Sequence, residues 1–306
     1  IAHMMSIPLI VTEEPLAAQA KAYYPGLNVI YWDVSCVAEN LVTSFDTVFC
    51  SMPRPLFDEA FFFAQKLLKK KVRTIWLPHG NSDKGHKAPS MEALEHDTAA
   101  WVYAQKMIDF LKEKNVFHHL DVTVVGNFRY AYYQKHRAFY DALIDQLLPT
   151  TKQTILYAPT WKDTENSSSF DEAFPILVKN LPPEYALVIK PHPNLVISEI
   201  SSGPDILLLN NFPPIYPLLN RTAIYIGDMS SIGYDFLTFN RPMVFLNPNR
   251  RDPKNDPSLF LHQCGVTVNP EDYDKIYDFL DDQAHLSSVR KAVYDYTFKT
   301  VKQLDL

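Results

Sequence analysis

Short apolar runs alternate with amphipathic stretches throughout the first half of the chain. The apolar runs have the length and composition of buried strands, whereas the stretches between them repeat apolar residues with helical spacing. We expect strands at 7–11, 28–32, 47–50, 73–77, 101–104 and 121–125, and helices at 14–23, 56–70, 105–114 and 129–148. Such alternation is typical of an α/β domain with a mostly parallel sheet and helices on both faces.

The same alternation restarts after a polar, proline-containing linker at 149–152. We expect strands at 154–158, 185–190, 206–209, 223–226, 243–246 and 265–268, and helices at 170–180, at 214–219, from 270 and from about 287. The helix from 270 carries the i, i+3, i+4, i+7 stripe of a packed helix, at Tyr273, Ile276, Tyr277 and Leu280.

The length of 306 residues fits two domains. We predict two doubly wound, Rossmann-like domains that face a cleft, the N-terminal one at 5–149 and the C-terminal one at 150–306. The C-terminal helix is the element that could pack back on the N-terminal domain.

The segment 223–237 contains the most informative turn of the sequence. A short apolar strand breaks at Gly227, and Asp228 or Ser230 would then cap a helix that Pro242 closes. Free backbone N–H groups, two serine hydroxyls and a helix N-terminus at one point are typical of a phosphate site. An ordinary capped helix is the commoner origin of such a turn, so the turn alone does not decide the function.

The composition excludes several classes of site. The net charge of −6 gives no general basic field for nucleic acid. Three widely spaced cysteines fit neither a disulfide framework nor a zinc pattern, and they indicate a reducing compartment. The chain has no G-x-G-x-x-G fingerprint, no P-loop and no apolar run of membrane-spanning length. We expect no metal site, because the acids of Asp272-Tyr273-Asp274 fall in the first turn of a predicted helix.

Loops that directly follow predicted strands carry unusual polar residues. In open α/β sheets the ligand binds beyond the carboxyl ends of the strands, so these loops form the candidate site. His79 and His192 follow strands in different predicted domains, and histidine suits proton transfer near neutral pH. Prolines fix the backbone on both sides of His192, although a strand-end histidine commonly just caps a turn. A cleft between the domains would bring the two histidines together.

Three blocks of sequence in these loops resemble a known family. They are Tyr-Ala-Pro-Thr-Trp-Lys-Asp at 157–163, Ile-Lys-Pro-His-Pro at 189–193, and Asp-Met-Ser-Ser at 228–231 followed by Asp-Phe at 235–236. In order and spacing they resemble the CDP-glycerol glycerophosphotransferase family of teichoic acid synthesis.

Two upstream blocks extend the resemblance to roughly 73–248. His79-Gly80 resembles the family's His-Gly block, and Gly126-Asn127 with Arg129 resembles its segment at the end of the first domain. The family's upstream block usually reads Trp-His-Gly-Thr-Pro, whereas this chain has Pro-His-Gly-Asn-Ser at 78–82. This departure bears on the acceptor more than on the fold.

The resemblance implies a glycosyltransferase-B type architecture and a transferase activity, with the acceptor on the N-terminal side and the nucleotide donor on the C-terminal side. The family moves glycerol phosphate from CDP-glycerol to a hydroxyl of a cell-surface polymer or lipid-linked acceptor and releases CMP. The resemblance makes His79 the general base on the acceptor hydroxyl and His192 a ligand of the donor phosphates. The expected donor-phosphate residues are Ser230, Ser231, Lys190 and Thr160, with Gly80, Asp83, Lys84, Trp161, Asp228 and Arg250 in supporting positions.

Neither an obligatory metal nor another cofactor is expected, and no nucleic-acid partner. We expect a cytoplasmic protein with peripheral contact to the inner face of the membrane. Two alternatives stay open at this point. One is a glycosyltransferase of the same architecture with a CMP- or UDP-linked sugar donor, and the other is a non-catalytic nucleotide- or glycan-binding protein.

Overall fold

The computed structural model describes residues 1–51, 58–84, 89–162, 166–195, 197, 203–210, 212–281 and 283–299. They form two compact units. Unit 1 contains residues 1–79, 89–132, 298 and 299, and unit 2 contains residues 80–84 and 133–297. The division therefore falls at 132/133 and not at the predicted 149/150, and residues 80–84 group with the second half of the chain.

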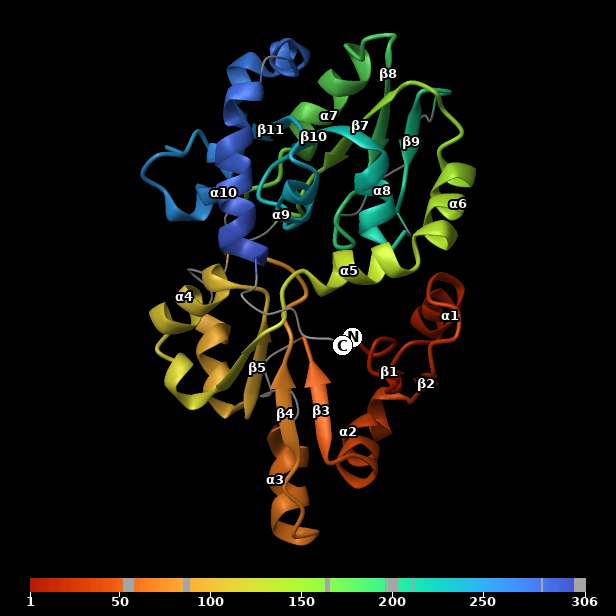
Figure 1. The fold of residues 1–306 in the computed structure, drawn as a ribbon, viewed down its shortest axis with the longest axis vertical. Helices are drawn as coiled ribbons and strands as arrows, with labels where there is room; N and C mark the ends of the chain where they lie inside the picture. The colour runs from red at the N-terminus through yellow and green to blue at the C-terminus, as the bar shows by residue number, and fades with distance from the viewer. Residues whose placement is uncertain are drawn as a thin grey trace. The chain divides into compact units, whose positions relative to one another are not determined.

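Unit 1 holds two parallel sheets (Figure 1). The first pairs β1 (Leu9–Val11) with β2 (Val29–Tyr31). The second has the order β3-β4-β5-β6, with strands Thr47–Cys50, Arg73–Trp76, Ala99–Val102 and Asp121–Val124. Each predicted strand is found, although β1 begins two residues after the predicted 7 and β5 lies two residues before the predicted 101–104.

The helices of unit 1 lie between these strands. They are α1 (Glu14–Tyr23), α2 (Val34–Ser44), α3 (Asp58–Leu67), α4 (Gln105–Glu113) and the start of α5 (Phe128–Lys135), with the 3₁₀ helices η3 (Pro89–His96) and η4 (Phe117–His119). The single helix predicted at 129–148 is wrong. His136, with φ −114° and ψ 23°, interrupts the helical backbone, and a separate helix α6 (Arg137–Leu147) follows in unit 2.

Unit 2 is built on one six-stranded parallel sheet, part of which is labelled in Figure 1. Its strands are β7 (Gln153–Ala158), β8 (Tyr185–Ile189), β9 (Ile206–Leu208), β10 (Thr222–Gly227), β11 (Met243–Leu246) and β12 (Val266–Val268). Their spatial order is β12-β11-β10-β7-β8-β9. Counted within the unit, this is the 3-2-1-4-5-6 order of the Rossmann fold, so the strand order reverses between β7 and β10.

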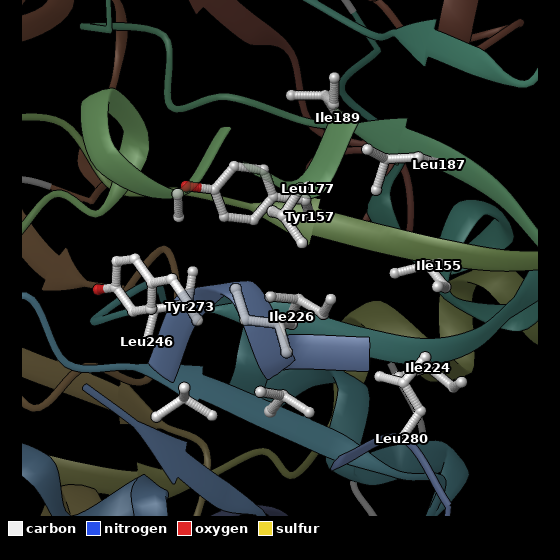
Figure 2. Close-up of a cluster of buried hydrophobic side chains, with 14 residues drawn as sticks. Ile155, Tyr157, Leu177, Leu187, Ile189, Ile224, Ile226, Leu246, Tyr273 and Leu280 are labelled. Atoms are coloured by element: carbon white, nitrogen blue, oxygen red, sulfur yellow. The ribbon is translucent and has the colours of Figure 1, made fainter. Parts of the chain in front are cut away.

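The sheet of unit 2 is buried on both faces. One face carries Ile155, Tyr157, Ile224 and Ile226, which alternate along β7 and β10 and pack in a single cluster with Tyr273 (Figure 2). Neighbours that point to the other face, such as Leu156 and Tyr225, are equally buried. This is the double coverage expected of a parallel sheet flanked by helices.

The remaining helical elements of unit 2 lie between these strands and after β12. They are α7 (Phe170–Lys179), α8 (Ile215–Arg221), α9 (Ile232–Phe236) and α10 (Ser287–Phe298), with the 3₁₀ helices η5 (Leu237–Phe239), η6 (Pro257–Cys264), η7 (Pro270–Phe279) and η8 (Ala284–Leu286). The stripe predicted on the helix from 270 does pack on the core, but that helix is 3₁₀ and not α. In the part of the chain that the structure describes, no helix has the length and hydropathy of a membrane span.

The predicted cap of the helix after Gly227 is wrong. Ser231 occupies the N-cap position of α9, and its side chain makes no capping hydrogen bond. The helix itself has five residues. The carboxylate of Asp228 is directed to other partners, which are described below.

Candidate functional site

The loops that follow β7 and β10 meet where the strand order of unit 2 reverses. This is the position at which open α/β sheets bind ligands. Asp228, directly after β10, accepts hydrogen bonds from the Thr160 backbone N–H at 2.8 Å and from the Ser169 N–H and hydroxyl at 2.9 Å each. Burial raises the pKa of Asp228 to about 6, although these hydrogen bonds and Lys84 oppose the rise. Asp228 therefore joins two loops that lie 68 residues apart in sequence.

Residues 80–84 pack against the same site from within unit 2. Lys84 Nζ lies 2.6 Å from Thr160 Oγ1. Asp83 is buried, and it accepts hydrogen bonds from the Tyr234 hydroxyl and, at 3.1 Å, from the Leu261 backbone N–H. The sequence placed Asp83 and Lys84 on the N-terminal domain, whereas the structure places both beside the loops of the second unit.

Lys190 is a buried cation at the end of β8. Its side chain is 9% exposed, and no acidic group among the described residues forms an ion pair with it. Burial lowers its pKa, because an ammonium loses hydration without gaining a counter-charge. Backbone hydrogen bonds from Lys190 to Tyr157 and from His192 to Pro159 hold the β8 loop against the β7 loop.

His192 is oriented by its backbone and by one ring neighbour. Its Nδ1 accepts a hydrogen bond from the Asn194 N–H at 3.1 Å, so the neutral ring carries its proton on Nε2. The Trp161 ring stacks on it at 6.0 Å between centroids and an interplanar angle of 29°. His192 therefore presents a donor N–H, which suits contact with a phosphate oxygen.

The two serines of the β10 loop are half-buried. Ser230 Oγ accepts a 3.4 Å hydrogen bond from the Ile232 N–H, and Ser231 precedes α9. Because α9 is so short, its dipole adds little, and the hydroxyls and backbone N–H groups remain as the donors of this loop.

The arginines after β11 have different surroundings. Arg250 is exposed and forms an ion pair with Glu271 at 3.0 Å. Arg251 is more buried, pairs with Asp256, and donates to the sulfur of Met229 at 3.3 Å. Of the two, Arg251 thus contacts the residue that precedes Ser230, although the sequence analysis selected Arg250.

His79 lies three residues after the end of β4 in unit 1. More than a third of its surface stays exposed, yet partial burial of the ring and the nearby Arg129 guanidinium lower its pKa. A lowered pKa keeps the imidazole neutral at neutral pH, as a general base requires. Arg129 belongs to the upstream block noted in the sequence, and its guanidinium lies 5.6 Å from the centre of the Tyr103 ring.

Ser169 is a site residue that the sequence analysis missed. It is fully buried, and its hydroxyl lies between Asp228 and the Tyr157 hydroxyl, 2.8 Å from the latter. A serine followed by the acidic first turn of α7 is a signal that could have indicated it. Asp163, the last residue of the first sequence block, lies outside the described residues.

Comparison with known proteins decides the family. A family model described as CDP-Glycerol:Poly(glycerophosphate) glycerophosphotransferase matches residues 80–260, more than half of the chain. The chain belongs to this glycerophosphotransferase family. The matched residues contain the loops after β7, β8, β10 and β11 and the segment 80–84. His79 lies one residue before the match.

Curated relatives of this glycerophosphotransferase family act in teichoic acid synthesis. The teichoic acid glycerol-phosphate primase of Bacillus spizizenii is 32% identical over 140 residues, which are 44% of this chain and 36% of that protein. The teichoic acid glycerol-phosphate transferase of Staphylococcus aureus is 30% identical over 105 residues, 32% of this chain and 27% of that protein. The chain thus spans about a third of the length of these relatives.

Solved structures confirm the predicted fold. The wall teichoic acid polymerase TagF has a TM-score of 0.66 at 16% identity, over 95% of this chain and 84% of that chain. A UDP-GlcNAc 2-epimerase from Neisseria meningitidis has a TM-score of 0.55 at 11% identity, over 97% and 86%. This member of the glycerophosphotransferase family therefore has a glycosyltransferase-B type fold.

Proposed function

We propose that the chain transfers glycerol phosphate from CDP-glycerol to a hydroxyl of a cell-surface polymer or lipid-linked acceptor, with release of CMP. The observation that carries the proposal is Lys190, a buried cation without an acidic partner among the described residues, at a strand end next to the switch point. An unpaired buried charge is costly. A donor diphosphate would supply the missing negative charge. A neighbouring structure described as TagF H444N soaked with CDPG supports this donor class.

The residues at the switch point suit phosphoryl transfer. Such reactions depend on placed donors that meet the charge on the phosphate oxygens and on an oriented nucleophile. Lys190, the Nε2–H of His192 and the hydroxyls of Ser230 and Ser231 are the donors that we assign to the diphosphate.

The proposed reaction is a single displacement at phosphorus. His79 takes the proton of the acceptor hydroxyl, whose oxygen attacks the phosphorus that carries glycerol. The bond from that phosphorus to the oxygen of CMP breaks, and CMP leaves with the electron pair. The lowered pKa of His79 supports its role as the base. A cytoplasmic setting, peripheral membrane contact and the lack of a metal requirement stay predictions.

A thermal-shift titration with CMP, CDP-glycerol, CMP-sialic acid and UDP-sugars, with and without magnesium, tests the donor. A ligand at about 100 times its Kd adds about 2.7 kcal/mol to the free energy of unfolding. We expect the largest shift with CDP-glycerol and a smaller shift when Ser230→Ala and Ser231→Ala are combined. A shift with sugar nucleotides alone would replace this reaction by glycosyl transfer. Binding with no CMP release by either donor would indicate a non-catalytic protein.

A further inference from the structure

A small cavity borders the loop that carries Ser230 in unit 2. Its volume of about 10 Å³ is roughly that needed for one water molecule. The residues on its wall include Ser230, Asp228, Asp83, Ser258 and His262. All of them belong to unit 2.

Among these residues, His262 is a buried side chain with one ring nitrogen that lacks a hydrogen-bond partner among the described residues. It is 4% exposed, its ring stacks on Phe245 with centroids 4.7 Å apart, and its Nδ1 lies 3.2 Å from Thr267 Oγ1. Its Nε2 is buried and has no hydrogen-bond partner among the described residues. Burial, with Arg251 nearby, lowers the pKa of His262 to about 3, so the ring is neutral at physiological pH.

The other polar groups on the wall narrow the choice of partner for this Nε2. Both carboxylates already accept hydrogen bonds on each of their oxygens, Asp228 from the β7 side and Asp83 from Tyr234 and Leu261. Three serine hydroxyls remain, those of Ser82, Ser230 and Ser258. A cavity of this volume admits one water molecule, and buried waters commonly make two to four hydrogen bonds to the polar groups around them.

We propose that His262 is a positioning residue for Ser230: through one water in this cavity, its Nε2 orients the Ser230 hydroxyl toward the donor phosphate. Only the identity of the donor rests on the proposed function, because the proposed contact between ring, water and hydroxyl involves no ligand. His262 lies two residues beyond the family match and in no sequence block, so it is absent from the expected site.

Two conservative variants of His262 test the roles of its two ring nitrogens separately. The amide of glutamine reaches the place of Nε2, whereas that of asparagine reaches only the place of Nδ1. We expect His262→Asn to weaken CDP-glycerol binding about tenfold, the size of one hydrogen bond, and His262→Gln to stay within about threefold of wild type. Equal Kd values for the two variants, or no change in either, would overturn the proposal.

A double-mutant cycle distinguishes positioning from a general loss of packing. If His262 acts through Ser230, His262→Asn should have little further effect on donor affinity in a Ser230→Ala background. The same tenfold loss in both backgrounds would show that His262 acts independently of Ser230.

A ligand-free measurement keeps this proposal separate from the proposed function. In ¹⁵N-histidine-labelled protein, the Nε2 resonance of His262 should move when Ser230→Ala is introduced. An unchanged resonance refutes the contact, even if a histidine variant fails to fold. If wild type does not bind CDP-glycerol, the proposed function fails, and this resonance still decides the role of His262.

Discussion

The substitution Asp228→Asn should remove the pH dependence that titration of the buried Asp228 carboxylate gives to the stability of unit 2. Asp228 is 1% exposed, and burial raises its pKa from 3.8 to about 6. Hydrogen bonds from Ser169 and Thr160 oppose the rise without cancelling it. The folded state therefore binds a proton at Asp228 more readily than the unfolded state does.

The sign and size of the effect follow from linkage. Because the folded pKa is the higher one, the stabilisation is complete below about pH 4 and is lost as the pH rises through 6. The rise in pKa from 3.8 to about 6 corresponds to about 3 kcal/mol in total. Between pH 5 and pH 7, the part that is lost amounts to about 1 kcal/mol.

Urea unfolding at pH 5, 6 and 7, followed by circular dichroism, measures this difference. The free energy of unfolding of wild type should fall by about 1 kcal/mol more than that of Asp228→Asn over this range. The variant should be less stable at every pH. Its amide N–H₂ would face one of the two backbone N–H groups that now donate hydrogen bonds to the carboxylate. The pH slope is therefore the test.

Asp252→Asn is the matched control. Asp252 is exposed, and hydrogen bonds from the Lys254 N–H and the Asn255 amide lower its pKa. Its titration lies below the measured window, so this variant should keep the wild-type slope. Parallel curves for wild type and Asp228→Asn between pH 5 and pH 7 would refute the reasoning.

Three further substitutions test the site and its support. Lys190→Met should raise the free energy of unfolding of the ligand-free protein in chemical denaturation, since a buried unpaired charge is removed. It should also weaken CDP-glycerol binding about 10- to 100-fold in titration calorimetry. His79→Ala should lower kcat for CMP release by about 10²–10⁴ with an unchanged donor Kd, and a parallel change in both would contradict its role as a base. Gly227→Ala should destabilise the protein by about 1–3 kcal/mol in urea unfolding, because a Cβ there would lie 2.1 Å from the Tyr225 hydroxyl; unchanged stability would mean that the ring can move aside.

Local pattern predicted the elements better than the contacts of single residues. The strands of both halves were predictable because buried parallel strands are short and apolar on both faces, as in β7 and β10. The break at His136 was not, because the apolar spacing continues through it while its backbone leaves the helical region. The capping prediction for Asp228 followed from residue type, but its partners lie 59 and 68 residues away in sequence.

The same limit applies to the candidate site. The strand-end position of Lys190 and His192 followed from sequence, whereas the absence of an acidic partner for Lys190 among the described residues became visible only in the folded unit. The sequence marks Ser169 only through the acidic first turn that follows it and has no motif at His262, and the burial and distant neighbours of both residues appear only in the folded unit.

The sequence by itself determined the α/β class, the positions of most strands, the loops that carry the site and, through its ordered blocks, the family. Periodicity and motif spacing report local burial and local chemistry, so these features need no knowledge of which strands are neighbours. The tertiary structure alone decided that β7 lies beside β10, and that Asp83 and Lys84 belong with the second unit. It also decided that Asp228 joins two loops and caps no helix, because these contacts arise between segments far apart in sequence, and pairing across such distances leaves no local signal.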